Sequence, residues 1–347
     1  EGLELSLAAN ISYADNSDML MWQNDSMGYV PLDSSLNHST GWDFYLDPVV
    51  SYHHNKLKHT FRNRYLRLNN NSKSKDVDYT NWSDQYFGQY SLQYFLHEKL
   101  VLTGGFSASH TTSHSVVFQG KHTSANQAAF LQADASPWKW LNLNFGMRYE
   151  NASLDDVSYS KPVFRGGLSV AILPGTHLRA SYGEAFRFPA ISEAFISTSF
   201  GPISIYPNPG LKPETGYTYE GGLRQMFRLG AIQGYLDFAV FNQKYDDMME
   251  YTFANWGVPG TITGLGFKAL NVGSTTISGI EISTALEGSF KPKISYRLLA
   301  GYTYTKPVSD HPSQPIAQDN NGNDLTYINS SSDTSSYILK YRYQHMA

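Results

Sequence analysis

The sequence predicts an all-β protein, a transmembrane up-and-down antiparallel β-barrel, and three observations lead to this fold class. Segments of the chain alternate apolar and polar side chains with period two, which is the pattern of strands rather than of helices. Connections of a few residues alternate with long ones rich in Gly, Asn, Ser and Asp. No apolar run reaches the roughly 18 residues that a spanning helix needs. If the chain crosses a membrane, it therefore crosses it with strands.

The two faces of the predicted strands differ in the same way along the chain. Residues 141–150 read LNLNFGMRYE, so that Leu, Phe, Met and Tyr alternate with Asn, Gly, Arg and Glu, and the same contrast recurs at 85–96, 178–182 and 294–304. Charged side chains that recur on one face of strand after strand do not suit the dry interior of a β-sandwich. We predict that the apolar side faces lipid and that the charged side faces a watery or plug-filled lumen.

The order of the elements predicts about fourteen strands. Tight turns are expected at 54–56, 97–99, 137–139, 173–176, 229–230 and 290–293. Between them, the first strand at 3–13 is followed by a polar connection to about Gly41, the strand at 57–68 by a loop to Ser83, and further loops are expected in the Ser/Thr/His-rich segment before the sixth strand and at 151–160. The last strand is expected to begin near Ser335. Short turns at one rim and long loops at the other are typical of a membrane barrel.

Aromatic residues at the ends of segments fit the same fold. Trp138, Trp140, Tyr302 and Tyr304 lie where an aromatic belt at a membrane interface would be. Ordinary strand propensity of aromatic residues is the alternative explanation.

Composition sets further bounds on the function. The chain has 347 residues, a formal net charge of -4 and 16% charged residues, which permits one large all-β domain or two smaller ones. The absence of a basic cluster argues against a nucleic-acid partner, and the absence of Cys excludes disulfides and thiolate sites. Because the sequence begins at Glu1 with no signal peptide, we interpret it as mature, processed or partial material. Nothing indicates an enzyme, and no catalytic residue is predicted.

Four segments resemble one known family. The segments YGEAFRFP (182–189) and NPGLKPE (208–214) are similar to the Phe-Arg-x-Pro and Asn-Pro-x-Leu-x-Pro-Glu signatures in the barrels of TonB-dependent outer-membrane transporters. NVGSTTISGIE (271–281) and GYTYT (301–305) resemble two later strands of that family. The resemblance implies a barrel of about 22 strands around an N-terminal plug. Residues 1–347 would then be a partial barrel domain with about fourteen strands, without the plug and the closing strands.

The resemblance also implies a function. It implies active import of a scarce, bulky nutrient across the outer membrane of a Gram-negative bacterium, powered through the TonB energy-coupling complex by way of the plug. A ferric siderophore or cobalamin is the expected cargo. Haem transporters of the family carry a His between the two signatures, and residues 190–207 contain none, which argues against haem. The alternatives are a passive porin or fatty-acid-type channel, favoured by strand count alone, and a surface adhesion barrel. A surface lipoprotein is a further partner that the family leaves open.

Candidate ligand contacts lie in the long connections. Aromatic anchors dominate such contacts, and the candidates are Trp22, Tyr29, Tyr206, Tyr251 and Trp256. Arg187, in the first signature, is the charged candidate. It can instead pair with Glu214 in a structural rim loop whose path is fixed by the prolines around it. Both interpretations stay open.

Charged residues on the predicted inner face form a second set of candidates. They are expected to line the seat of the plug or to contact substrate: Arg148, Arg179, Glu220, Arg224, Asp237 and Arg297.

One segment has the spacing of a cation site. Asp319, Asn321 and Asn323 fall at alternate positions, as oxygen ligands of calcium often do. The downstream Glu of a calcium-binding helix-loop-helix is absent, and Asn-Gly is first of all a turn signal. A calcium site and a plain turn are both open, and no other cofactor is predicted.

Overall fold

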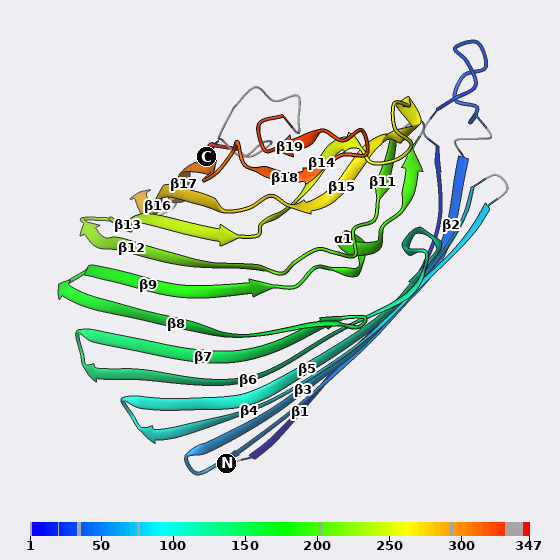
Figure 1. Cartoon of the computed structure of the whole chain (residues 1–347). Coiled ribbons are helices and arrows are strands. Elements are labelled where there is room, and N and C mark those ends of the chain that lie inside the picture. Colours follow the sequence, from blue (N-terminus) through cyan, green and yellow to red (C-terminus); the bar gives the residue numbers. More distant parts are fainter. Residues whose placement is uncertain are drawn as a thin grey trace.

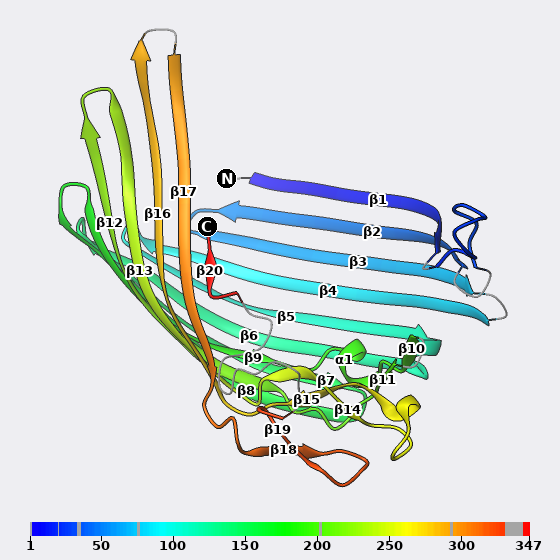
Figure 2. The same ribbon diagram turned by 90° about the horizontal axis from the view of Figure 1, so that it is seen from above.

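A single antiparallel sheet of fourteen strands, taken in sequence order, forms the body of the computed structural model, which describes residues 2–19, 21–32, 36–74, 77–200, 203–291, 294–329 and 343–347. Its strands are β1 (Gly2–Met19), β2 (Leu36–His54), β3 (Leu57–Ser74), β4 (Val77–His97), β5 (Leu100–Ser115), β6 (Gly120–Trp138), β7 (Leu141–Leu154), β8 (Val157–Leu173), β9 (Thr176–Arg187), β12 (Glu214–Leu229), β13 (Ile232–Asp246), β16 (Thr275–Lys291), β17 (Ile294–Ser309) and β20 (His345–Met346). Two views show them as one continuous curved wall with β1 at one edge and β17 near the other (Figures 1 and 2). The predicted up-and-down order and strand number are confirmed.

Smaller elements lie in the long connections. Between β9 and β12 lie α1 (Ile191–Phe195), β10 (Thr198–Phe200) and β11 (Ile203–Tyr206); between β13 and β16 lie β14 (Met249–Asn255) and β15 (Leu265–Asn271); β18 (Pro315–Gln318) and β19 (Asp324–Thr326) follow β17. Short 3-10 helices occupy Val116–Phe118 and Ile262–Gly264. A second sheet has the order β10-β11-β15-β14, and β18 pairs with β19. Figure 1 shows these elements at the side of the wall opposite the tight turns. We call the two edges the loop rim and the turn rim.

The tight turns at the turn rim are confirmed wherever the structure describes them. Turns of two residues join β2 to β3, β4 to β5, β6 to β7, β8 to β9 and β12 to β13. At the β8–β9 turn, Gly175 has φ +80, and an added Cβ would lie 2.9 Å from the carbonyl oxygen of Met226. A Gly is therefore needed there both for its backbone conformation and for space. The expected turn at 290–293 includes residues 292 and 293, which lie outside the described residues, as does the predicted start of the last strand near Ser335.

The prediction of long loops was wrong at several places on the loop rim. Residues 69–74 and 77–83 belong to β3 and β4, and residues 14–19 and 36–41 belong to β1 and β2. The loop expected at 151–160 is a two-residue turn between β7 and β8, with Asp155 at φ 48. The segment before β6 is reduced to the short 3-10 helix. Asn- and Ser-rich segments read as loops, yet paired strands can extend beyond an apolar band because water can solvate both faces there.

The register separates the strand residues into an apolar and a polar face. On β7, Phe145 lies opposite Ala133 of β6 and Gly166 of β8, and it is 57% exposed. Gly166 in turn faces Tyr182 of β9, which lies opposite Tyr219 of β12. Large exposed side chains thus alternate with small ones from β6 to β9, and on β9 and β12 two exposed Tyr residues lie opposite each other. Such a surface has the side chains expected of a lipid-facing band.

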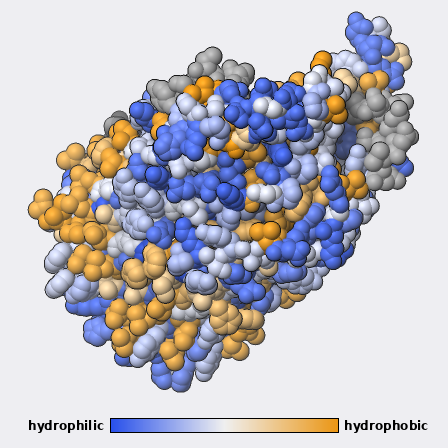
Figure 3. Space-filling view, in the orientation of Figure 1, coloured by the Kyte–Doolittle hydropathy of each residue, from blue (hydrophilic) through white to orange (hydrophobic). Residues whose placement is uncertain are grey.

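The opposite face is polar and carries the loops. Arg148 and His122 belong to it by register, and the ring of His122 stacks on Phe195 of α1 at 3.6 Å between ring centroids. α1 therefore lies against the polar face. In the space-filling view, hydrophilic residues cover much of the middle of the surface shown, and hydrophobic ones gather near the turn rim (Figure 3). None of the helices in the described part of the chain is long and apolar enough to span a membrane.

Aromatic residues mark both ends of the apolar face. Near the turn rim, Trp138 and Trp140 stack at 5.4 Å and both are exposed. Near the loop rim, Trp42 and Trp82 each lie 5.7 Å from the guanidinium of Arg67. These positions are those of an interfacial aromatic belt.

Candidate functional site

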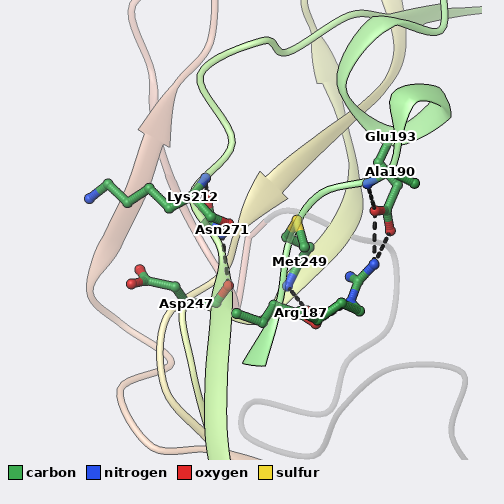
Figure 4. A network of polar contacts seen from close by, with 8 residues as sticks. Arg187, Ala190, Glu193, Lys212, Asp247, Met249 and Asn271 are labelled. Carbon is green, nitrogen blue, oxygen red and sulfur yellow. Dashed lines mark hydrogen bonds and ion pairs between the residues drawn. The ribbon is translucent and has the colours of Figure 1, made fainter. Parts of the chain in front are cut away.

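A network of charged and polar groups joins the two signature segments at the end of β9. Arg187 donates from Nε to Glu214 Oε2 at 2.5 Å and from Nη1 to both carboxylate oxygens of Glu193, at 2.9 and 2.8 Å. The second oxygen of Glu214 accepts from the backbone N–H of Met249 at 2.5 Å, and Glu193 accepts from the N–H of Ala190 at 2.8 Å (Figure 4). The pairing of Arg187 with Glu214 is confirmed. One guanidinium thereby ties α1, β12 and the start of β14 together.

Asn271 fastens the second signature to the same region. Its Nδ2 donates to the carbonyl oxygens of Lys212 and Asp247, at 3.0 and 2.7 Å, and its Oδ1 accepts from the N–H of Lys212 at 2.9 Å. Asn208 adds a bond from its Nδ2 to the carbonyl oxygen of Ala269, at 2.8 Å. The third similar segment, which begins at Asn271, thus meets the second one through backbone groups.

The electrostatics of this network follow from its pairing. The hydrogen bond to Glu214 raises the pKa of the Arg187 guanidinium, and the bonds to Glu193 add to this against the opposing effect of burial. Arg187 is therefore a permanent cation held between two carboxylates. Nearby, burial raises the pKa of the Tyr251 hydroxyl, with a smaller contribution from the charge of Glu193. The phenol of Tyr251 is therefore neutral at physiological pH.

The loop elements share a small apolar core. Trp256 is only 8% exposed and packs with Ala254, Leu270 and Leu325, with Tyr206 against the edge of this cluster. The indole N–H of Trp256 donates to the carbonyl oxygen of Thr252 at 3.1 Å. The sequence placed Trp256 in a long connection as a candidate ligand contact, and its burial shows that it contributes to the core of the loop layer. Its direct contact with a ligand stays an untested prediction.

The other aromatic candidates lie in different places. Tyr251 is 46% exposed on β14, whereas Tyr206 is half-buried and donates from its hydroxyl to the carbonyl oxygen of Thr263 at 3.2 Å. Trp22 and Tyr29 form an edge-to-face pair at 5.8 Å in the connection between β1 and β2, and Tyr29 is 83% exposed. Tyr251 and Tyr206 belong to the same small sheet, while Trp22 and Tyr29 form a separate exposed pair.

Charged candidates on the polar face form pairs and clusters. Asp237 accepts from Arg179 at 2.8 Å and from Arg224 at 2.6 Å, and Arg179 also donates to Glu220 at 3.1 Å. These four residues connect β9, β12 and β13. Elsewhere on the face, Arg148 pairs with Glu150, and Arg297 pairs with Glu287 at 3.3 Å. The strand register places these residues on one face of the sheet, and their position in a lumen and their contact with a plug stay predictions.

The candidate calcium residues form a hydrogen-bonded turn. Asp319 Oδ1 accepts from the N–H groups of Asn321 and Asn323 at 3.0 and 2.8 Å, and Asn321 Oδ1 accepts from the N–H of Gly260 at 2.8 Å. Burial tends to raise the pKa of Asp319, but its hydrogen bonds, first that from the Asn323 backbone, outweigh this and lower the pKa. The oxygens thus hold the turn and dock it on the loop at Gly260. Among the described residues, no group of three or more His, Asp or Glu is arranged to hold a metal.

Sequence reasoning missed several residues that organise the loop rim. His122 places its two ring nitrogens 2.7 Å from Asp155 Oδ2 and 2.8 Å from the carbonyl oxygen of Phe118. Glu193 caps α1 while it pairs with Arg187. The signal for Glu193 was its place in the first turn of a short helix after Pro189, where a carboxylate is favoured. No local pattern indicated the partners of His122.

Comparison with protein families decides the assignment. A family model described as "TonB dependent receptor-like, beta-barrel" matches residues 4–345. The chain belongs to this family. The signatures at 182–189 and 208–214 that suggested it are those that the Arg187 network joins. A search of curated protein sequences finds no match to the chain.

Solved structures show the same fold in other TonB-dependent receptors. The siderophore receptor PirA from Acinetobacter baumannii aligns with a TM-score of 0.61 at 14% identity, covering 93% of this chain and 52% of that one. A mutant of the ferric enterobactin receptor PfeA from Pseudomonas aeruginosa gives 0.64 at 12%, covering 93% and 57%. A double mutant of the Serratia marcescens hemophore receptor HasR, in complex with its hemophore HasA and heme, gives 0.60 at 15%, covering 88% and 59%. The chain spans about half the length of these proteins.

Proposed function

We propose that this TonB-dependent receptor barrel is part of an outer-membrane importer that takes up a bulky, scarce nutrient, with a ferric siderophore or a corrinoid such as cobalamin as the cargo class. The observation that carries the proposal is the Arg187 network, because it joins the family signatures and moors a folded layer of loops at one rim of the barrel. A moored loop layer can form a binding vestibule, since a preorganised site loses less entropy when a ligand binds. The TonB complex would act as the energy source, and a surface lipoprotein could serve as an additional partner.

The membrane setting is argued from the apolar face. Its large side chains, exposed in the isolated chain, would be buried in lipid, and its aromatic residues at both ends would lie at the interfaces. The family's outer-membrane barrels have the same arrangement of strands.

Calcium at the 319–323 turn would add an ion to the loop layer. A titration with calcium that leaves the protease sensitivity of this turn unchanged would count against a calcium site.

Uptake by the complete gene product tests the function. A strain that expresses the full-length protein is supplied with radiolabelled ferric siderophores and with labelled cobalamin, in the presence and absence of TonB and of the proton gradient. Import that needs both TonB and the gradient is expected. Ion conductance in a planar bilayer without any energy source, together with TonB-independent uptake, would instead support a passive channel. Binding to host cells or surfaces without any uptake would support the adhesion barrel.

A further inference from the structure

A depression of about 620 Å³ lies on the polar face, where β2 to β5 approach the loop rim. Fourteen described residues line it, and most of them carry amide, hydroxyl or aromatic groups, among them Asn70, Asn81, Ser83, Ser113, Ser115 and Tyr79. No Asp, Glu, Lys or Arg is among these fourteen. The lining is therefore polar but carries no permanent charge.

The strand register explains why the lining is uncharged. Asn70 lies opposite Asn81, and Ser83 lies opposite Ser113, so these side chains form adjacent rows on the polar face. On β3 and β4 the charged residues of these segments fall at the alternate positions. Arg67 and Asp84 pair at 3.1 Å on the other face. The nearest polar-face carboxylate in register is Asp43, opposite Leu68 of β3, and its charge would repel an anion.

The groups in the depression are suited to a neutral, hydrogen-bonding ligand. Asn side chains and hydroxyls can each donate and accept, which matches ligand amides and hydroxyls that also do both. Some are preorganised: the hydroxyls of Ser83 and Ser113 lie 2.8 Å apart, and Ser115 donates to Asn81 Oδ1. The ring of Tyr79 adds an apolar contact surface. A charged group placed here would lose water without gaining an ionic partner.

The loop layer supplies a second, independent observation on charge. The connections at 188–213, 247–274 and 310–329 contain six carboxylates and two lysines, a formal net charge of -4. A field of this sign at the rim lowers the local concentration of anions and slows their approach. Polyanionic cargo would therefore be disfavoured both on its way to the depression and inside it.

We infer that the depression between β2 and β5 binds an electrically neutral surface of the cargo that is rich in amide or hydroxyl groups, so that this receptor selects neutral over polyanionic cargo. The inference rests on the proposed import function and narrows its substrate class. A neutral hydroxamate siderophore and a corrinoid both present this chemistry. Ferric catecholate and carboxylate complexes, which are anionic, do not.

Binding to the purified full-length protein tests the inference. Ferrichrome, cyanocobalamin and ferric enterobactin are the probes, and the two neutral compounds are the arms that distinguish a siderophore from a corrinoid. One neutral probe is expected to bind at least about 100-fold more tightly than ferric enterobactin, since a desolvated charge without a partner costs several kcal/mol. The change Asn70→Leu is expected to weaken that binding about five- to tenfold, the value of one hydrogen bond.

The adjacent residue provides a matched control. Asn69 belongs to the apolar-face side of the same strand, opposite Trp42 and Trp82, so Asn69→Leu is expected to leave affinity unchanged. If Asn70→Leu fails to reach the membrane, Asn70→Asp replaces it in the test. This change keeps the shape of the side chain and is expected to weaken binding of the neutral probe by a similar factor. Ferric enterobactin as the tightest probe, with Asn70 variants equal to wild type, would overturn the inference and leave the import function intact. Failure of all three probes to bind, with no TonB-dependent uptake of any nutrient tested, would overturn the proposed function itself.

Discussion

Two arginines of β9, eight positions apart, have the same kind of partner and different consequences. Arg179 is the fourth residue of the strand and pairs with Glu220 and Asp237, and Arg187 is the last residue and pairs with Glu193 and Glu214. The carboxylates of Arg187 also accept backbone N–H groups, from Ala190 and Met249. The Arg179 cluster consists of contacts between side chains on three neighbouring strands. The Arg187 network therefore fixes loops to the barrel, and the Arg179 cluster fixes neighbouring strands to one another.

The comparison shows that the partners beyond an ion pair decide what the pair does. The side chain of Asp237 is 7% exposed and accepts from two guanidinium groups, so its removal should lower the stability of the whole sheet. Arg187 is about half exposed and connects segments that each fold locally. Its removal should weaken the docking of the loop layer and change the stability of the barrel little.

The largest expected effect is that of Asp237→Ala. It leaves Arg179 and Arg224 close together without their shared acceptor, and we expect a loss of about 2 to 3 kcal/mol in the free energy of unfolding, below the value for a fully buried pair because both guanidinium groups are partly exposed. Urea unfolding followed by tryptophan fluorescence measures it. Arg224→Ala, which leaves the pair of Asp237 with Arg179, is the control and should cost less. An unchanged midpoint for Asp237→Ala would contradict the role given to the cluster.

Arg187→Ala is expected to give the opposite pattern. Glu193 and Glu214 lose their shared cation, and we expect the docking of α1 and β14 to weaken by about 2 kcal/mol, with the unfolding midpoint of the barrel nearly unchanged. Urea unfolding measures the midpoint of the barrel. Hydrogen exchange measures the docking, which should appear as faster exchange in 190–195 and 249–255 without a change in β9. Arg187→Lys should retain the docking of α1 and β14 only in part, because an ammonium group cannot bond to Glu193 and Glu214 with the geometry of the guanidinium. Faster exchange throughout the sheet would remove the distinction between the two arginines.

Asn271→Ala tests the neutral part of the rim. It removes one acceptor and two donor contacts to the backbone at 212 and 247, and we expect the docking of the 208–213 segment to weaken by about 1 to 2 kcal/mol. Limited proteolysis in this segment measures the change. Asn208→Ala, which loses fewer backbone contacts, should have a smaller effect, and equal protease sensitivity of Asn271→Ala and wild type would contradict the assignment.

The sequence predicted the wall of this protein better than its loop rim, for physical reasons that particular residues illustrate. Period-two alternation depends on neighbours in the chain, so the faces of Phe145 and Arg148 could be read directly. The pairing of Arg187 with Glu214 was one of the two interpretations that the signatures left open, and the structure shows it. The contact between Glu214 and Met249 spans 35 residues and depends on how two loops dock, which no local pattern encodes.

Two errors have the same origin. Trp256 lies among Gly, Asn and Pro and was predicted to be in a loop that contacts the ligand, yet the loops fold into a layer with a core of its own that buries it. The Asn-rich end of β3 reads as a loop, yet its backbone finds a partner strand in β4. In both cases a contact with a distant segment overrides the local signal, as is common for β-structure.

The smallest expected effect concerns the turn at Asp319 and its dependence on pH. Because the hydrogen bonds lower the pKa of Asp319 in the folded loop, its contribution to stability is present above the ordinary Asp pKa of about 3.9 and is lost as the pH falls through the lower folded value. Pepsin cleavage within 319–329 should therefore increase between about pH 4 and pH 2. Asp319→Asn should show cleavage with little dependence on pH, because its amide does not titrate in this range. Asp324→Asn is the control, because Asp324 lies in the same loop but makes one long side-chain contact, to Gln318 at 3.4 Å; it should retain the wild-type pH dependence of cleavage. Wild-type cleavage that does not change between about pH 4 and pH 2 would show that the Asp319 carboxylate does not hold this turn against the surface of the loop layer.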